Sequence, residues 1–212
     1  MIPVEKVNKY YEEYIEEISS KLDSVEVQQP GLLIGEKIKK IRETKGLTIE
    51  DVAKKTGFSK EFLEDIENGK VSPPLGIIVK LSKALDTMVA NLFSEPGEKN
   101  YCVMRVKEQK VVPRKSSTGY NYSYIPLASG LKEMNMEPFI VKLLPNSKEE
   151  KSVHEGEEFI YVLDGEVKVV IGDNVEILHM GDTIYYLSSV PHFITTNTDK
   201  PALILAVIYG AH

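Results

Sequence analysis

Cysteine is almost absent from this chain of 212 residues, in which Cys102 is the only one. A single thiol excludes a disulfide framework and a zinc site built from thiolates. Apolar runs are also short, and none approaches the roughly 20 residues that a membrane-spanning helix needs. The first residues lack the basic start and apolar stretch of a secretory signal peptide. We therefore expect a cytoplasmic protein that does not bind a membrane.

An excess of positive charge is lacking as well, since 26 Lys and Arg stand against 32 Asp and Glu, a net charge of −6. This balance argues against a general polyanion binder. The charge is uneven along the chain, however. Residues 33–93 hold 11 basic and 9 acidic residues, a net of +2, whereas residues 1–32 and 94–212 each have a net of −4. The middle segment is therefore the part that could present a basic face.

The spacing of apolar residues divides the chain into parts. Residues 5–22 carry an apolar stripe at helical spacing with an acidic opposite face. Residues 34–93 read as short helices, and the later residues alternate in the manner of strands separated by turn pairs such as Asp164-Gly165. The sequence therefore predicts an α + β two-domain chain. We expect an N-terminal helical extension (1–32), an all-α domain (33–93), a linker (94–100) and an all-β domain (101–212).

The all-α segment contains clear helix ends. Gly46 is placed to end a helix, Thr48 with Asp51 forms a capping-box pattern, Gly57 suits a tight turn, and Ser59 is placed to cap the next helix. The segment closely resembles the repressor/Cro-type helix-turn-helix domain. The resemblance is carried by Ile38-x-x-Ile41-Arg42, Gly46-Leu47-Thr48, Val52-Ala53, Gly57-Phe58-Ser59 and Ile66-Glu67-Asn68-Gly69.

This resemblance implies that the helix starting near Ser59 enters the major groove of DNA, and that the start of the preceding helix also touches the duplex. The expected DNA contacts are Thr48, Ser59, Lys60, Glu61 and Glu64. Two features depart from the family pattern. Ile49 stands where the family often has Gln, and the recognition helix carries four acidic residues against one lysine. Because carboxylates oppose phosphate contact, the alternative is a packing or oligomerisation module.

Two patterns stand out in the all-β segment. The first runs from His154 through Glu158 to Gly165, and the second from Gly181 to His192. Together they resemble the two motifs of the cupin superfamily over about residues 100–210. Ser152 replaces one His of the usual first motif. The resemblance implies a fold in which an N-terminal all-α helix-turn-helix domain precedes an all-β cupin (double-stranded β-helix) barrel.

The cupin motifs bring a possible metal site. Glu158, Ile160 and Val162 share one face of a strand by period two. The Glu158 carboxylate would therefore be buried in the barrel, which is costly unless another group pairs with it. With His154 and His192 it makes two imidazoles and one carboxylate, the facial triad of non-haem Fe(II) sites; zinc, nickel or manganese would also fit. The predicted metal ligands are His154, Glu158 and His192. The alternative is a buried Glu–His hydrogen-bond network without metal.

Aromatic residues supply a possible small-molecule site. We predict that an effector contacts Tyr122, Tyr124, Tyr161, Tyr185 and Phe193, which would line or rim the barrel. A packed ladder of aromatic side chains between strands is the alternative. No catalytic residue is assigned.

The order of the two domains resembles a bacterial and archaeal group of transcription regulators with a C-terminal cupin sensor. This implies a DNA-binding regulator that responds to a small-molecule effector. A homodimer or higher homo-oligomer would place two recognition helices about one DNA turn apart.

Two other functions stay open. One is a mononuclear non-haem Fe(II) cupin oxygenase resembling hydroxypropylphosphonate epoxidase, in which a lysine of the helical domain binds substrate; its nearest counterpart here is Lys45 or Gly46. The other is an oligomeric small-molecule-binding protein without DNA binding. In that case the N-terminal stripe of Tyr11, Ile15, Ile18 and Leu22 would be an assembly surface; otherwise we expect the stripe to cap the helical domain.

Overall fold

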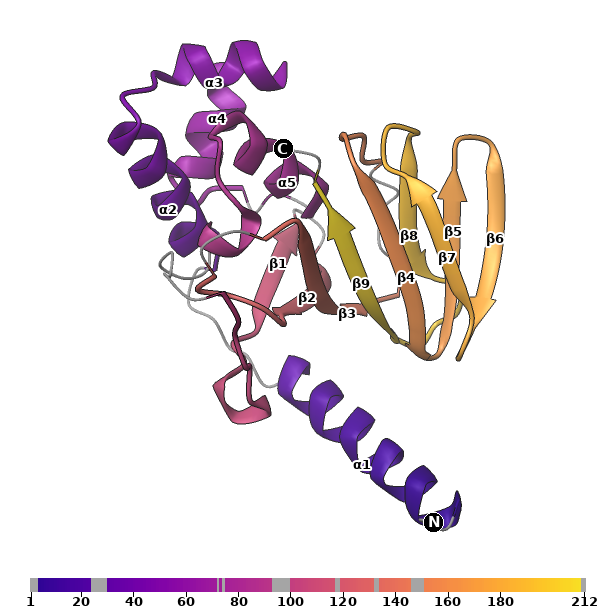
Figure 1. Cartoon of the computed structure of the whole chain (residues 1–212). Coiled ribbons are helices and arrows are strands. Elements are labelled where there is room, and N and C mark those ends of the chain that lie inside the picture. Colours follow the sequence, from indigo (N-terminus) through magenta and orange to yellow (C-terminus); the bar gives the residue numbers. More distant parts are fainter. Residues whose placement is uncertain are drawn as a thin grey trace.

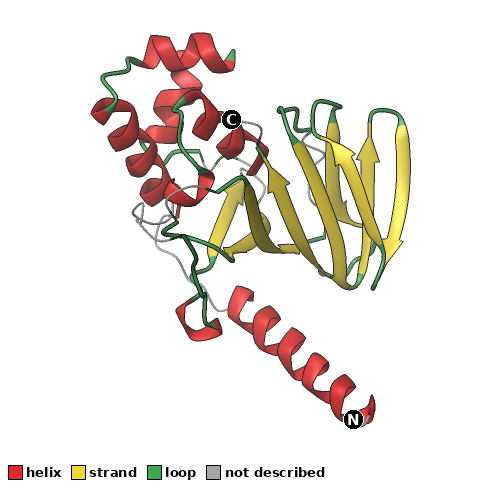
Figure 2. Cartoon of the chain, viewed as in Figure 1, coloured by secondary structure: helices red, strands yellow, loops and turns green. Residues whose placement is uncertain are grey.

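The chain folds into helices followed by strands, as Figure 2 shows. The computed structural model describes residues 4–23, 30–71, 73, 75–92, 100–116, 119–131, 134–145 and 151–210. Within them the predicted α + β order is confirmed. The predicted linker 94–100 falls almost wholly outside the described residues, so the domain limits stay predictions. Among the described helices, none combines the length and apolar character needed to cross a lipid bilayer.

The helical part begins with one long helix and continues with four shorter ones. They are α1 (Val4–Asp23), α2 (Pro30–Thr44), α3 (Ile49–Thr56), α4 (Lys60–Glu67) and α5 (Leu75–Ala84), followed by the 3-10 turns η1 (Val89–Leu92) and η2 (Val106–Glu108). Thr48 and Asp51 form the expected capping box of α3, and Gly57 ends that helix with a left-handed φ of 73°. The Ser59 side chain caps α4. The local signals in the sequence thus fix the helix ends.

The strands form two antiparallel sheets (Figure 1). The six-stranded sheet has the order β1-β2-β3-β9-β4-β7, and the three-stranded sheet has the order β6-β5-β8. The strands are β1 (Val112–Ser116), β2 (Gly119–Pro126), β3 (Met136–Leu143), β4 (Glu157–Asp164), β5 (Glu166–Ile171), β6 (Asn174–His179), β7 (Thr183–Leu187), β8 (His192–Thr196) and β9 (Ala202–Tyr209). Val162 of β4 and Val167 and Val169 of β5 are fully buried between the two sheets.

One hydrophobic core runs through both parts of the chain. Ile66 and Leu81 on the helical side belong to the same cluster as Ile160 and Val169 of the strands. Apolar surface buried at such a junction stabilises it by roughly 25 cal/mol per Å². The helical region is therefore packed onto the barrel rather than tethered to it.

Helix α1 packs on the barrel, so the expectation that its stripe caps the helical domain is wrong. Figure 1 shows α1 away from α2–α5. The cluster that it joins consists of Ile18 and Leu22 with Ile125, Ile140 and Leu203. The buried ammonium of Lys142 on β3 also donates to the Asp23 carboxylate at 2.7 and 2.8 Å. The sheet offers α1 both an apolar face and a charged partner.

Helices α2 and α4 cross at very close range. A Cβ atom at Gly35 of α2 would overlap the carbonyl oxygen of Ile66 and come 2.8 Å from that of Glu67. Glycine is therefore the residue that allows the two backbones to approach.

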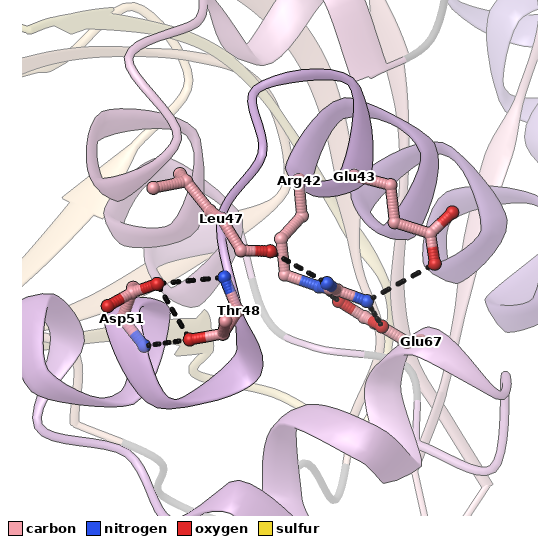
Figure 3. Close-up of polar contacts among 6 residues, drawn as sticks. All are labelled: Arg42, Glu43, Leu47, Thr48, Asp51 and Glu67. Atoms are coloured by element: carbon pink, nitrogen blue, oxygen red, sulfur yellow. Dashed lines mark hydrogen bonds and ion pairs between the residues drawn. The ribbon is translucent and has the colours of Figure 1, made fainter.

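A buried ion pair fixes the same crossing (Figure 3). Arg42 donates from Nε and Nη2 to the two carboxylate oxygens of Glu67, at 2.6 and 2.9 Å, and from Nη1 to the Leu47 carbonyl at 2.9 Å. The side chains of Arg42 and Glu67 are only 11% and 7% exposed. One guanidinium thus joins α2, the turn before α3 and α4.

Gly35→Ala tests the close crossing. In a helix interior this change ordinarily stabilises by about 1 kcal/mol because alanine has the higher helix propensity. Here we expect a net loss of stability, since the added methyl group would push α2 from α4, at a cost of about 1–3 kcal/mol. Urea unfolding measures the difference, with the exposed Lys39→Ala of the same helix as control. A Gly35→Ala protein that is more stable than the wild type would contradict the close approach of α2 and α4 at this residue.

Glu67→Ala tests the buried pair. It leaves the Arg42 guanidinium without its carboxylate, and we expect a loss of about 3–5 kcal/mol in the free energy of unfolding. Glu43 is the matched control because it also faces Arg42, at 3.5 Å, but is 56% exposed. Glu43→Ala is expected to cost less than about 1 kcal/mol. Urea unfolding measures both losses. Equal losses in the two variants would show that the buried Arg42–Glu67 pair stabilises the fold no more than the exposed contact with Glu43.

Candidate functional site

The centre of the barrel holds His154, Glu158 and His192. On β4, Glu158 alternates with Ile160 and Val162, and all three are buried. His192 begins β8, and its backbone exchanges two hydrogen bonds with Ser152, at 2.8 and 3.0 Å. This bridge holds the segment before β4 against β8, which brings His154, two residues after Ser152, beside His192.

The three side chains point at a common centre. One ligand atom from each lies within 4.8 Å of the others. The Nε2 atom of His154 is 2.9 Å from Oε1 of Glu158, and Nε2 of His192 is 3.3 Å from the same oxygen. The two imidazole rings stand edge to face, with centroids 5.2 Å apart. The structure therefore brings together the trio that the sequence singled out.

The other ring nitrogens decide which atoms carry protons. Nδ1 of His154 is 3.1 Å from the carbonyl oxygen of Glu155, and Nδ1 of His192 is 2.9 Å from that of Val190. A carbonyl oxygen only accepts, so each Nδ1 carries the hydrogen. In the neutral rings both Nε2 lone pairs then face a carboxylate oxygen. Three acceptors aimed at one point fit a divalent cation, and the carbonyl contacts at Nδ1 are those of metal-binding histidines.

The same contacts shift the pKa values of Glu158 and His192. Burial raises the pKa of Glu158, but the side-chain contacts of His154 and His192 with this carboxylate, together with their charge when protonated, outweigh burial and hold this pKa well below its usual range. Burial lowers the pKa of His192, but its hydrogen bond to Glu158 and the carboxylate charge outweigh that effect and raise it. The buried carboxylate therefore needs positive charge from a proton or a metal.

Two further side chains hold Glu158. The Tyr186 hydroxyl donates to Oε2 at 2.6 Å, and the Ser188 hydroxyl donates to Oε1 at 3.4 Å. Burial and the neighbouring Glu158 charge raise the pKa of Tyr186 well above its usual value, so it stays a donor. Neither role is predicted from the sequence. The pairing of Glu158 with Tyr186 across β4 and β7 depends on a register that joins distant segments.

Of the five aromatic residues predicted to contact an effector, the four whose side chains the structure describes do not gather in one place. Tyr124 is 1% exposed and packs edge-on against Phe139 in the core. Tyr161 and Tyr185 are 37% and 60% exposed, on the outer face of the sheet, where Tyr185 donates to Glu157. Phe193 is buried, and because it follows His192 in β8 it points to the opposite face. The Tyr122 side chain lies outside the described part of the chain.

The five residues predicted to contact DNA are all exposed. The Thr48 hydroxyl accepts from the Asp51 backbone N–H at 3.1 Å (Figure 3). The Ser59 hydroxyl accepts from the Phe62 backbone N–H at 3.2 Å. An ion pair from Lys60 of α4 to Glu50 of α3 joins the first turns of these helices. The structure therefore places two capped helix N-termini side by side on the surface.

The acidic character of α4 is smaller than the sequence suggests. The Glu67 carboxylate is buried against Arg42. The Asp65 carboxylate lies 2.9 Å from the Lys70 ammonium. Glu61 and Glu64 remain as the exposed acidic residues of α4. Two of the four carboxylates of α4 are therefore paired within the protein, and only two are left to oppose contact with phosphate.

Lys45, which the epoxidase resemblance would bring to a substrate, lies within the helical region. Its ammonium donates to the backbone carbonyl of Asp86 and lies 3.3 Å from the Asp86 carboxylate. The structure thus turns this side chain to the end of α5 rather than toward the trio.

Comparisons with known proteins agree with both halves of the chain. Residues 38–87 match the helix-turn-helix family, and residues 139–208 match the cupin domain family. The HTH-type transcriptional regulator PuuR of Escherichia coli is 24% identical over 163 residues, which cover 76% of this chain and 86% of PuuR. The uncharacterized HTH-type transcriptional regulator y4dJ of Sinorhizobium fredii is 32% identical over 66 residues, which cover 31% of this chain and 86% of y4dJ.

A solved structure shares the fold of both domains. The crystal structure of an HTH_3 family transcriptional regulator from Vibrio cholerae superposes with a TM-score of 0.66 at 23% identity, covering 86% of this chain and 97% of that one. With the helix-turn-helix match and with y4dJ covered over most of its length, this chain belongs to the helix-turn-helix transcriptional regulators and carries a C-terminal cupin domain.

Proposed function

We propose that this protein binds double-stranded operator DNA through α3 and α4 and regulates transcription in response to a small molecule bound by its cupin domain. The observation that carries the proposal is the paired surface of α3 and α4, whose first turns are capped, exposed and joined by the Glu50–Lys60 pair. Its membership of the helix-turn-helix regulators supports the same reading. The proposal places the protein in the cytoplasm with the DNA.

The helix ends are suited to phosphate contact. A helix N-terminus carries a partial positive charge and free N–H groups, both of which favour an anion. Thr48, Ser59 and Lys60 lie at these ends, while Glu61 and Glu64 remain for base edges, where a carboxylate can accept from cytosine. The Arg42–Glu67 pair holds α4 against α2, so that the exposed face of α4 is available for contact with the duplex.

Two copies of this surface suit an operator with two half-sites. Helix-turn-helix proteins of this kind bind as dimers whose recognition helices lie about one DNA turn apart. We therefore propose a homodimer.

The trio in the barrel is proposed to hold a divalent cation such as Fe(II), Zn, Ni or Mn. Three lone-pair donors converge there, and two histidines with one carboxylate leave coordination positions open. A bound cation would offer a Lewis-acidic contact for an anionic or carbonyl group of the effector. Tyr186 and Ser188 hold the Glu158 carboxylate in place by hydrogen bonds and thereby orient this ligand toward the cation.

Lys60→Ala tests the DNA surface. We expect weaker binding to a duplex of the promoter of its own operon, with a salt slope smaller by about 1, because one phosphate contact is lost. Fluorescence anisotropy over a salt series gives both values. Lys9→Ala is the control, since it removes the same charge from an exposed position on α1. Wild-type binding to DNA without salt dependence, or equal losses of DNA affinity in the two variants, would contradict DNA binding through α3 and α4.

His192→Ala and Glu158→Gln test the cation site. Wild-type protein is expected to bind one Co²⁺ per chain in a calorimetric titration, and each variant should lose this binding because one of three ligands is gone. His179→Ala is the control, as the His179 side chain is 66% exposed and lies away from the trio. Equal Co²⁺ content in all four proteins would reject the ligands. Uptake of oxygen with Fe(II) and a small phosphonate or carboxylate, above the Glu158→Gln level, would favour the oxygenase instead.

A further inference from the structure

Helix α5 of the helix-turn-helix region lies directly against the segment that carries His154. A Cβ atom at Gly76 would come 2.5 Å from Oγ and 2.7 Å from Cβ of Ser152, and 3.4 Å from Cδ2 of His154. Side chains rarely approach so closely, so the α5 backbone contacts this segment at a point where only glycine fits. A methyl group at Gly76 would lie within van der Waals range of the His154 imidazole, so this point of α5 is close to the first proposed ligand.

A second contact lies two turns further along the same face of α5. The Lys83 ammonium is 3.3 Å from the carbonyl oxygen of Glu155 and 3.5 Å from its carboxylate. The same carbonyl oxygen accepts from Nδ1 of His154 at 3.1 Å. Lys83 therefore touches the atom that sets the tautomer and orientation of His154.

The other side of α5 is tied to the DNA-binding helices. Ile78 and Leu81 of α5 are fully buried in the cluster that also contains Val52 of α3 and Ile66 of α4. The Lys55 ammonium of α3 donates to the Ala84 carbonyl at the end of α5, at 3.0 Å. A shift of α5 against residues 152–155 would therefore move α3 as well.

We propose that α5 couples the His154/Glu158/His192 centre to DNA binding, with Gly76 and Lys83 as the positioning residues of that contact. A cation held by the trio fixes the His154 ring, and the fixed ring orders α5 and, through it, α3. Ordering before DNA arrives lowers the cost of ordering on binding. A divalent cation therefore raises the affinity for the operator, and by reciprocity the operator raises the affinity for the cation by the same factor. This inference rests on the proposed function.

The coupling is measured with Co²⁺ as the cation and the promoter duplex as the DNA. For wild-type protein we expect saturating Co²⁺ to tighten DNA binding about fivefold or more, the size typical of such couplings. Lys83→Met should bring this factor toward 1, since it removes the ammonium and keeps the stem. Lys80→Met is the matched control on the same helix, because its ammonium lies over the Phe58 ring and not against residues 152–155.

A size exchange tests the Gly76 contact. Gly76→Ala should also bring the factor toward 1, because its methyl group overlaps the Ser152 side chain. Adding Ser152→Gly removes both overlapping atoms and leaves an ordinary contact with His154 at 3.4 Å, so the double variant should recover the coupling. A double variant in which the coupling stays lost would contradict a role for this contact.

Hydrogen exchange provides a second measurement that needs no DNA. Co²⁺ should slow amide exchange in residues 75–84 and 49–56 of wild-type protein, and not in Lys83→Met. An undiminished factor in Lys83→Met, or unchanged exchange in α5 of wild-type protein that binds Co²⁺, would overturn the inference and leave the proposed function standing. Wild-type protein that binds no Co²⁺ or no promoter duplex would overturn the proposed function and the inference together.

Discussion

A carboxylate buried between two apolar sheets is costly unless positive charge lies beside it, and Glu158 is such a carboxylate. Two imidazoles, a tyrosine hydroxyl and a serine hydroxyl converge on it. The bridge between Ser152 and His192 and the pairing of Glu158 with Tyr186 draw these side chains from four separate segments. The close contact of α5 with residues 152–155 then extends the same arrangement to the helix-turn-helix region.

The parts that sequence alone predicted depend on local rules. Thr48, Gly57 and Ser59 end or begin helices because their side chains or permitted φ values act within a few residues. The inward position of Glu158 follows from strand alternation with Ile160 and Val162. Resemblance to the cupin motifs added His154 and His192, which the structure places beside it. Strand alternation starting from Glu158 also predicts that Tyr161 points outward, as the structure shows. We had instead grouped Tyr161 with the residues that line or rim the barrel.

The parts that could not be predicted depend on contacts between distant segments. In the sequence, Glu67 is one of the acidic residues of the recognition helix. In the structure its carboxylate is buried against Arg42, which lies 25 positions earlier in the chain. The apolar stripe of α1 could pack on any apolar surface, so the sequence does not identify its partner. In the structure α1 packs on the barrel, where Lys142 of the sheet also binds Asp23. Tyr186 gains its role through strand register. The approach of Gly76 to Ser152 joins two domains, and the residues between them give no local signal of it.

The proposed cation would be shared by two imidazoles and one carboxylate inside the barrel. X-ray absorption at the cobalt edge of the Co²⁺-loaded protein reports the atoms around the metal itself and therefore identifies its ligands. We expect scattering from two imidazole rings together with oxygen ligands, and one imidazole fewer in His154→Ala. A spectrum of oxygen ligands alone, unchanged in that variant, would contradict it.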